Sequence, residues 1–284
     1  MKVWFKRMGG VFAVVVGGVL SGCSHGITGL GLVTGHQLEC DAASNVCGLS
    51  NTRQYLFAIQ GHGTCGTIGV NWGDGFAQNR AGDFAATSSR TWVSMDHRYS
   101  RTSAGQTVHS WPGPKQVHAY SVANCVGEAR FPFHLMHSTK QSDGSIRHNP
   151  AFVLAMGEKM DKPCNSVPNM VDLRIGSRVI VDELPTNRDM NFGCLFSGCI
   201  NGPEGNTGPV NAAFPFPTMR RHSLVLRVVN PVAGQVQLVQ GQAQRTEFVV
   251  NANGPLEFCV NDDVLGDNTG GWGLAIQVDE TAAR

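Results

Sequence analysis

Hydrophobic and polar residues alternate over short segments along much of this chain. The alternation is clear in residues 55–59 and 117–120, and again in residues 171–175 and 179–181. A period of two over a few residues is typical of a strand with one buried face. Turn-forming residues recur about every 8 to 12 positions, and long helical periods are missing from the sequence. We therefore expect an all-β protein.

The clearest pair of expected strands lies near the C-terminal end, in residues 256–260 and 272–278. The loop between them, residues 261–271, contains Asp262, Asp263, Asp267 and Asn268 among three glycines. Carboxylate and amide oxygens are hard ligands, and the glycines would let backbone carbonyls turn inward, so the loop predicts a calcium site. The alternative is that these residues only form turns. The helical calcium-hand pattern is excluded by the spacing.

The N-terminal segment has the features of a secretion signal. Lys2, Lys6 and Arg7 precede an apolar run, residues 11–20, that is too short to span a bilayer as a mature helix. Residues 20–23, Leu-Ser-Gly-Cys, match the bacterial lipoprotein box, so we expect cleavage before Cys23 and acylation of its thiol. Two or three acyl chains would hold the protein on a membrane.

Ser24 rather than Asp follows the lipid-bearing cysteine. By resemblance to sorted lipoproteins, this implies a cell-envelope protein on the outer membrane.

Eight cysteines remain after Cys23, an even number that suggests disulfides in an oxidising compartment. Eight cysteines allow 105 connectivities, and we expect local pairing. A zinc site is the alternative, but no CxxC motif is matched by a second one. The expected pairs are Cys40 with Cys47, Cys65 with Cys125, Cys164 with Cys259, and Cys194 with Cys199.

Length and local composition suggest two folded domains. Residues 1–22 are the expected signal peptide, and the Gly-, Ser- and Asn-rich residues 23–52 are the expected tether with a stapled loop. A more ordered start, with Leu30, Leu32 and Leu38 covering the first domain, is the alternative. The remaining divisions are a first β-sandwich in 53–138, a polar linker in 139–168 and a second β-sandwich in 169–284.

The first domain contains Trp72-Gly73-Asp74-Gly75 at the end of an expected strand, and later His109-Ser-Trp-Pro-Gly-Pro. These motifs resemble the PKD repeat, an immunoglobulin-like sandwich. The resemblance covers about 80 residues and implies that Trp72 fills the core while Asp74 caps the turn. It also implies that the ring of His109 packs or hydrogen-bonds against that turn.

The last part of the chain, about 110 residues, resembles the PA-IL-like galactophilic lectin family, a galactose-binding-like jelly-roll sandwich. The resemblance rests on Gly-Pro-Leu-Glu-Phe-Cys-Val-Asn-Asp and Asp-Asn-Thr-Gly-Gly-Trp, residues 254–262 and 267–272. It implies that Asp262, Asp267 and Asn268 bind calcium, whereas Asp263 matches no ligand. The family's sugar-reading loop carries a His and a Gln, and residues 202–212 contain neither.

Charge and motifs restrict the function further. The net charge is +1 and charged residues make up 15% of the chain, without the basic patch that a nucleic-acid binder needs. No HExxH or Gly-x-Ser-x-Gly motif occurs, so we expect no enzyme. The first expectation is a lipoprotein that binds carbohydrate through calcium. The alternatives are a structural or adhesion lipoprotein and an accessory module of an envelope hydrolase.

Overall fold

The computed structural model of the chain describes residues 26–36, 38–41, 43–84, 92–103, 105–156, 161–186, 188–193 and 199–281. The regular secondary structure of these residues consists of β-strands and one short 3-10 helix, η1 (Leu265–Asp267). The protein is therefore all-β, as the sequence predicts. None of the described segments forms a helix with the length and hydrophobicity that a bilayer span requires.

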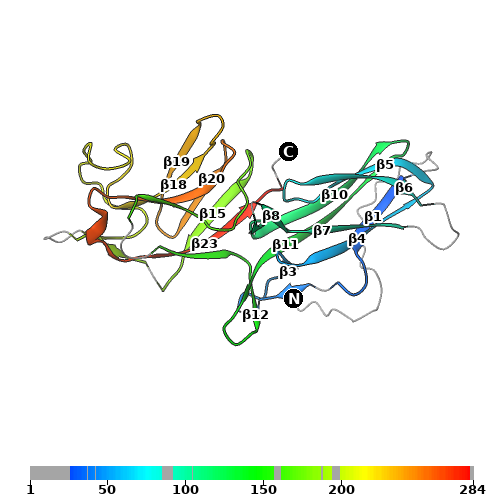
Figure 1. The fold of residues 1–284 in the computed structure, drawn as a ribbon, viewed down its shortest axis with the longest axis horizontal. Coiled ribbons are helices and arrows are strands. Elements are labelled where there is room, and N and C mark those ends of the chain that lie inside the picture. Colours follow the sequence, from blue (N-terminus) through cyan, green and yellow to red (C-terminus); the bar gives the residue numbers. More distant parts are fainter. Residues whose placement is uncertain are drawn as a thin grey trace, which may run out of the picture.

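The strands are arranged in two lobes that lie side by side along the long axis (Figure 1). The first lobe packs a three-stranded sheet, in the order β1-β4-β7, against a larger sheet, in the order β2-β3-β11-β10-β5-β6, with β12 paired to β11. The first of these sheets consists of β1 (Gly26–Leu32), β4 (Gln54–His62) and β7 (Trp92–Arg98). The larger sheet consists of β2 (Glu39–Cys40), β3 (Cys47–Ser50), β5 (Thr64–Asn71), β6 (Ala77–Asp83), β10 (Gly113–Ala123), β11 (Glu128–Lys140) and β12 (Ile146–Asn149).

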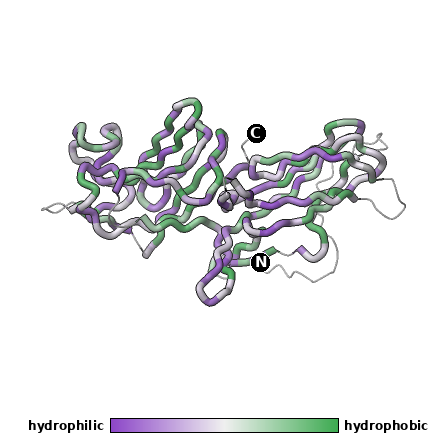
Figure 2. Tube along the Cα trace, viewed as in Figure 1, coloured by the Kyte–Doolittle hydropathy of each residue, from purple (hydrophilic) through white to green (hydrophobic). Residues whose placement is uncertain are grey.

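The core of the first lobe lies between these two sheets. Alternate residues of β4, among them Phe57 and Ile59, meet Ile68 and Val70 of β5, and all four are fully buried. Hydrophobic and hydrophilic segments are interspersed along the strands of both lobes (Figure 2), as expected when each strand has one buried face.

The Trp72–Gly75 turn follows β5. Trp72 is fully buried, and Asp74 accepts a hydrogen bond from the Phe76 amide, as the resemblance to the PKD repeat implies. The prediction that His109 contacts this turn is wrong. His97 of β7 stacks on Trp72 at 4.6 Å between ring centroids, and its Nε2 lies 2.9 Å from Asp74 Oδ2. The histidine that meets the turn comes from the facing sheet, and sequence distance from the turn gives no indication of it.

The expected tether in residues 23–52 is also wrong where the structure describes it. β1 pairs antiparallel with β4, and β3 pairs in parallel with β11. Leu30 and Leu49 are 1% and 0% exposed and belong to the first core. The glycine content of this segment suggested a flexible linker. At Gly48, however, the missing side chain permits close packing, because a Cβ there would lie 1.9 Å from the His134 carbonyl oxygen.

The second lobe also packs two sheets, in the orders β13-β23-β15-β20 and β14-β21-β18-β19. Smaller sheets have the orders β17-β16-β22 and β8-β9. The first main sheet consists of β13 (Phe152–Met156), β15 (Arg178–Glu183), β20 (Arg245–Val249) and β23 (Trp272–Asp279), and the second of β14 (Cys164–Ser166), β18 (Ser223–Val229), β19 (Val236–Gln240) and β21 (Leu256–Asn261). The small sheets contain β8 (Ser100–Ser103), β9 (Gln106–His109), β16 (Met190–Asn191), β17 (Ile200–Asn201) and β22 (Thr269–Gly270).

The expected linker in residues 139–168 is folded in its described parts, so this division is wrong too. β11 continues to Lys140 and turns back into β12, while β13 pairs with β23 and β14 pairs with β21. Polar residues from Gln141 to Ser145 suggested a domain boundary, but they form the turn of a hairpin. The chain passes from the first lobe to the second between β12 and β13.

Three of the four expected cysteine pairs are present as disulfides: Cys40–Cys47, Cys65–Cys125 and Cys164–Cys259. Cys199 is disulfide-bonded as well. Its expected partner Cys194 lies outside the described residues, as do the expected signal peptide and Cys23.

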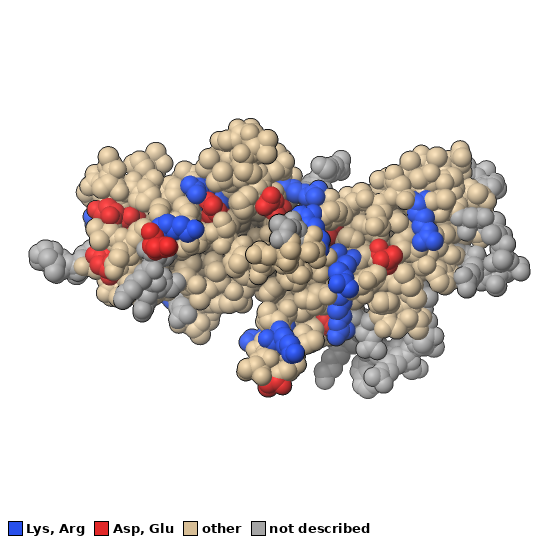
Figure 3. Space-filling view, viewed as in Figure 1, with Lys and Arg blue, Asp and Glu red and all other residues tan. Residues whose placement is uncertain are grey.

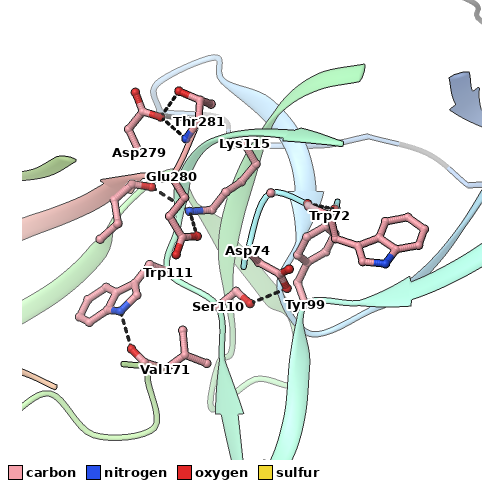
Figure 4. Close-up of polar contacts among 12 residues, drawn as sticks. Trp72, Asp74, Tyr99, Ser110, Trp111, Lys115, Val171, Asp279, Glu280 and Thr281 are labelled. Carbon is pink, nitrogen blue, oxygen red and sulfur yellow. Dashed lines mark hydrogen bonds and ion pairs between the residues drawn. The ribbon is translucent and has the colours of Figure 1, made fainter. Parts of the chain in front are cut away.

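The two lobes are joined by buried side chains at the start of β10 and the end of β23 (Figure 4). Lys115 Nζ lies 2.7 Å from Glu280 Oε2 and donates a hydrogen bond to the Val278 carbonyl. Trp111 belongs to a segment of the first lobe but packs in the second core, and its Nε1 donates a hydrogen bond to the Val171 carbonyl. The joint is therefore a packed interface that contains a buried ion pair.

Candidate functional site

The loop 261–271, expected to hold the cation, lies at the end of the second lobe that is remote from the joint (Figure 1). The two flanking strands form as predicted, but they are not a hairpin. β21 belongs to one sheet and β23 to the facing sheet, so the loop crosses between the layers of the sandwich. Its first and last side chains can therefore enter the top of the core, which a solvent-exposed hairpin turn does not allow.

Asn261 anchors the start of this loop. Its side chain accepts a hydrogen bond from the Phe216 amide and donates to the carbonyls of Phe216, Met219 and Arg220. All polar atoms of the side-chain amide are thereby used in holding the segment 216–220. Asn261 is thus a structural residue, and it fixes the position of Asp262 that follows.

The three expected ligands lie in two environments. Asp262 and Asn268 are each 2% exposed, whereas Asp267 is exposed at the end of η1. Asp267 packs against the backbone of Gly193, where an added Cβ would lie 2.2 Å from its Oδ2. The structure therefore brings the side chains of Asp262 and Asn268 into the interior and leaves Asp267 at the rim.

Asp262 Oδ2 and both amide atoms of Asn268 are buried without a hydrogen-bond partner among the described residues. Burying such polar atoms unpaired costs about 1–3 kcal/mol each. Burial, with a smaller contribution from the carboxylates of Asp263 and Asp267, raises the pKa of Asp262 to about 6, although the neighbouring Asn268 amide acts in the opposite direction. A cation among these oxygens would relieve both the missing partners and the repulsion between the carboxylates.

His222, immediately before β18, is the residue at this site that sequence reasoning missed. Its Nε2 lies 3.7 Å from Asp262 Oδ1, and its ring stacks on Phe192 at 4.7 Å between centroids. Burial lowers the pKa of His222, with a smaller contribution from Arg221. His222, Asp262 and Asp263 together form a cluster in which all three ligand atoms lie within 4.8 Å of one another. Nothing in the local sequence around His222 indicates this contact.

The partner of the other ring nitrogen decides what His222 can do. Asn206 Oδ1 accepts hydrogen bonds from the Gly208 amide and from Arg221, so Asn206 Nδ2 faces His222 Nδ1 at 3.2 Å. That amide donates, so Nδ1 accepts and the ring proton of neutral His222 is on Nε2, toward Asp262. Metal-binding histidines almost always show the reverse arrangement, with the second nitrogen donating to an acceptor.

His222 is therefore a hydrogen-bond donor beside the carboxylate, and the available ligand atoms are oxygens of Asp262, Asp263, Asp267 and Asn268. Such a set fits a hard cation better than zinc. The other group of possible metal ligands among the described residues contains Cys164, Glu257 and Cys259, and its two cysteines are joined in a disulfide.

The segment expected to rim the site lies next to it. Asn206 pairs with Arg221 as an isolated bridge, and the Leu224 amide donates to the Pro203 carbonyl. Acidic and basic side chains are interspersed over the face of the molecule in Figure 3.

Comparison with known proteins gives little further information. No family model matches the chain, and no curated protein matches it. The chain is similar to a solved structure from work on the promiscuous specificity of carbohydrate-binding modules of the β-sandwich superfamily. The two share 10% identity over 82% of this chain and 92% of the other, with a TM-score of 0.22, a degree of overlap that identifies neither family nor ligand.

Proposed function

We propose that this protein is a lipid-anchored protein of the cell envelope that binds carbohydrate through a calcium ion in the loop 261–271. The observation that supports the cation is the buried pair Asp262 and Asn268, in which one carboxylate oxygen and both amide atoms have no hydrogen-bond partner among the described residues, beside the carboxylate of Asp267. Calcium takes six to eight oxygen ligands, and the side chains supply only part of that number. When bound, it would offer its remaining positions to sugar hydroxyls at the rim formed by residues 202–212.

The lipid anchor rests on the sequence of residues 20–23. Acylated Cys23 would hold the two lobes at a membrane surface, on the outer membrane if Ser24 acts as a sorting residue. We assign the protein no catalytic role.

A second candidate is a structural or adhesion lipoprotein in which calcium only stiffens the loop. The depth of the site favours this candidate, because Asp262 and Asn268 are both 2% exposed. A cation fully wrapped by protein oxygens would have no position left for a sugar.

One experiment separates these candidates. Calcium binding to the mature chain is titrated by calorimetry, and glycan-array binding is measured with calcium and with excess EDTA. Saccharide binding that EDTA abolishes supports the lectin proposal, whereas a calcium-dependent rise in melting temperature without saccharide binding supports the structural one. In both cases Asp262→Asn removes most calcium affinity, and an unchanged titration in that variant contradicts the choice of loop.

A further inference from the structure

A cavity of about 490 Å³ lies at the joint between the lobes, far from the loop 261–271. Small-molecule sites commonly have volumes of about 300–1,000 Å³ and often lie at domain interfaces. The cavity is lined by Asn71, Gly73, Gln116, His118, Tyr120, Arg130, Glu280 and Thr281. Six of these residues come from the first lobe, and Glu280 and Thr281 follow the last strand of the second.

The alternation of β10 builds one wall. Val117 and Ala119 are fully buried in the first core, so Gln116, His118 and Tyr120 point to the opposite face of the strand and line the cavity. The other wall, at Glu280, is held by the buried contact with Lys115 (Figure 4). The docking of the two lobes therefore forms this cavity.

The charged groups of the cavity are paired within the protein. Arg130 contacts Glu128 at 3.1 Å and donates to Gln116 Oε1, and His118 Nε2 lies 2.8 Å from Glu128. Glu280 Oε2 is paired with Lys115. A ligand thus meets no large excess of either charge, which favours a neutral occupant over an anion or a cation.

The cavity wall offers both hydrogen-bond donors and hydrogen-bond acceptors. Glu280 is 5% exposed, and its Oε1 has no hydrogen-bond partner within the described parts of the chain. Because Oε1 is itself covered from solvent, Glu280 closes the wall and offers no acceptor to an occupant. The side-chain amides of Gln116 and Asn71 provide donors as well as acceptors.

Tyr120 adds an apolar surface. Its ring lies directly over Gly69 of β5, where an added Cβ would lie 2.5 Å from Tyr120 Cζ. The ring of His118 is 5.2 Å away, inclined by 41°. A ring held against the backbone gives a rigid face for C–H groups, while the surrounding amides meet hydroxyls.

We propose that this cavity is a second binding site, for a neutral, hydroxyl-rich ligand of the size of one or two pyranose units, and that it acts without a cation. A pyranose has a ring of hydroxyls for the side-chain amides of Gln116 and Asn71 and apolar C–H faces for Tyr120. The site is independent of the calcium site proposed for the second lobe.

The test uses the full mature chain in excess EDTA. Binding of neutral methyl pyranosides, of glucose, galactose, mannose and N-acetylglucosamine, and of maltose and cellobiose is measured by saturation-transfer NMR and calorimetry. We expect EDTA-resistant binding of at least one sugar, with affinity unchanged in Asp262→Asn. Absence of EDTA-resistant binding throughout the panel overturns the proposal, and so does binding of methylammonium or acetate at this site in place of every sugar.

Variants locate the binding. Gln116→Ala and Tyr120→Ala should each weaken it by at least about tenfold, whereas Gln60→Ala, a partly buried glutamine on β4, should leave it unchanged. Gln116 has a partly exposed side chain, so its variant should keep the wild-type melting temperature, and unchanged binding in that variant overturns the assignment. Calcium titrations of Gln116→Ala should match the wild type, which separates the failure of one site from the failure of the other.

Discussion

Lys115 forms an ion pair with Glu280 across the joint, 165 residues along the chain, with 2.7 Å between Nζ and Oε2. Both side chains are almost fully buried. Removing one partner of a buried ion pair leaves an uncompensated charge and costs about 3–5 kcal/mol. The pair crosses the joint together with Trp111, which packs in the core of the second lobe.

We predict that Lys115→Met lowers the free energy of unfolding by about 3–5 kcal/mol. The double variant Lys115→Met with Glu280→Gln should recover most of that loss, because no charge is then left unpaired. Urea denaturation followed by tryptophan fluorescence measures both. Equal stability of the single and double variants would show that the charge of Glu280 is not what makes the single substitution costly.

The binding of calcium should depend on pH through Asp262. Its pKa is raised to about 6, so the carboxyl is protonated below that pH in the calcium-free protein. Calcium affinity should fall by about tenfold per pH unit below about 6 and stay constant above it. Calorimetric titrations from about pH 5 to about pH 8 check the slope. A flat profile would mean that Asp262 is not a ligand.

The stability of the calcium-free protein should change in the opposite direction. Because the pKa of Asp262 is higher in the folded state than its ordinary value of 3.8, the folded state binds more protons between about pH 4 and pH 6. Its contribution to stability is therefore full at low pH and decreases as pH rises through this window. Melting curves in EDTA, compared with those of Asp262→Asn, isolate this contribution, which should vanish in the variant.

His222 should not act as a metal ligand. We expect His222→Asn, which suits the positive φ of 54° at this position, to change calcium and zinc affinities by less than about threefold each. If His222 bound metal through Nε2, zinc affinity alone would fall by about tenfold or more. Parallel titrations with the two ions distinguish these outcomes.

The glycine-rich start of the first lobe should contribute to its stability. Leu30→Ala is expected to cost about 2–4 kcal/mol, since Leu30 is 1% exposed in the first core. Leu38→Ala is the control, because Leu38 is 49% exposed and its loss should cost less than about 0.5 kcal/mol. Chemical denaturation compares them. Similar small losses in both variants would return residues 26–50 to the role of a tether.

Removing the Cys164–Cys259 disulfide should cost more than removing Cys40–Cys47. The two bridges close loops of 95 and 7 residues, and the chain-entropy relation gives a difference of about 2 kcal/mol in favour of the longer loop. Double alanine variants of each pair, unfolded in urea, measure this difference. An equal cost would show that strain or residual structure outweighs loop closure.

Local patterns in the sequence were sufficient for much of this protein. Alternating residues in β4, β21 and β23 predicted their strands, since burial of one face is a property of each segment by itself. Local signals also indicated the Asp74 turn, the short Cys40–Cys47 loop and the cluster of carboxylate and amide side chains after β21. The pairs Cys65–Cys125 and Cys164–Cys259 followed from the expectation that the first lies within the first domain and the second ties the entry of the second domain to its last strands.

Contacts between distant segments were decided only by the tertiary structure. Leu30 lies in a core and not in a tether because β4 pairs beside its strand. The alternation in β21 and β23 is the same whether the two strands pair with each other or lie in facing sheets, and only the structure shows that they face each other. His222 meets Asp262, and Lys115 meets Glu280, because the sheets bring them together. Periodicity reports which face of a strand is buried, but the neighbour on that face is selected by packing of the whole chain.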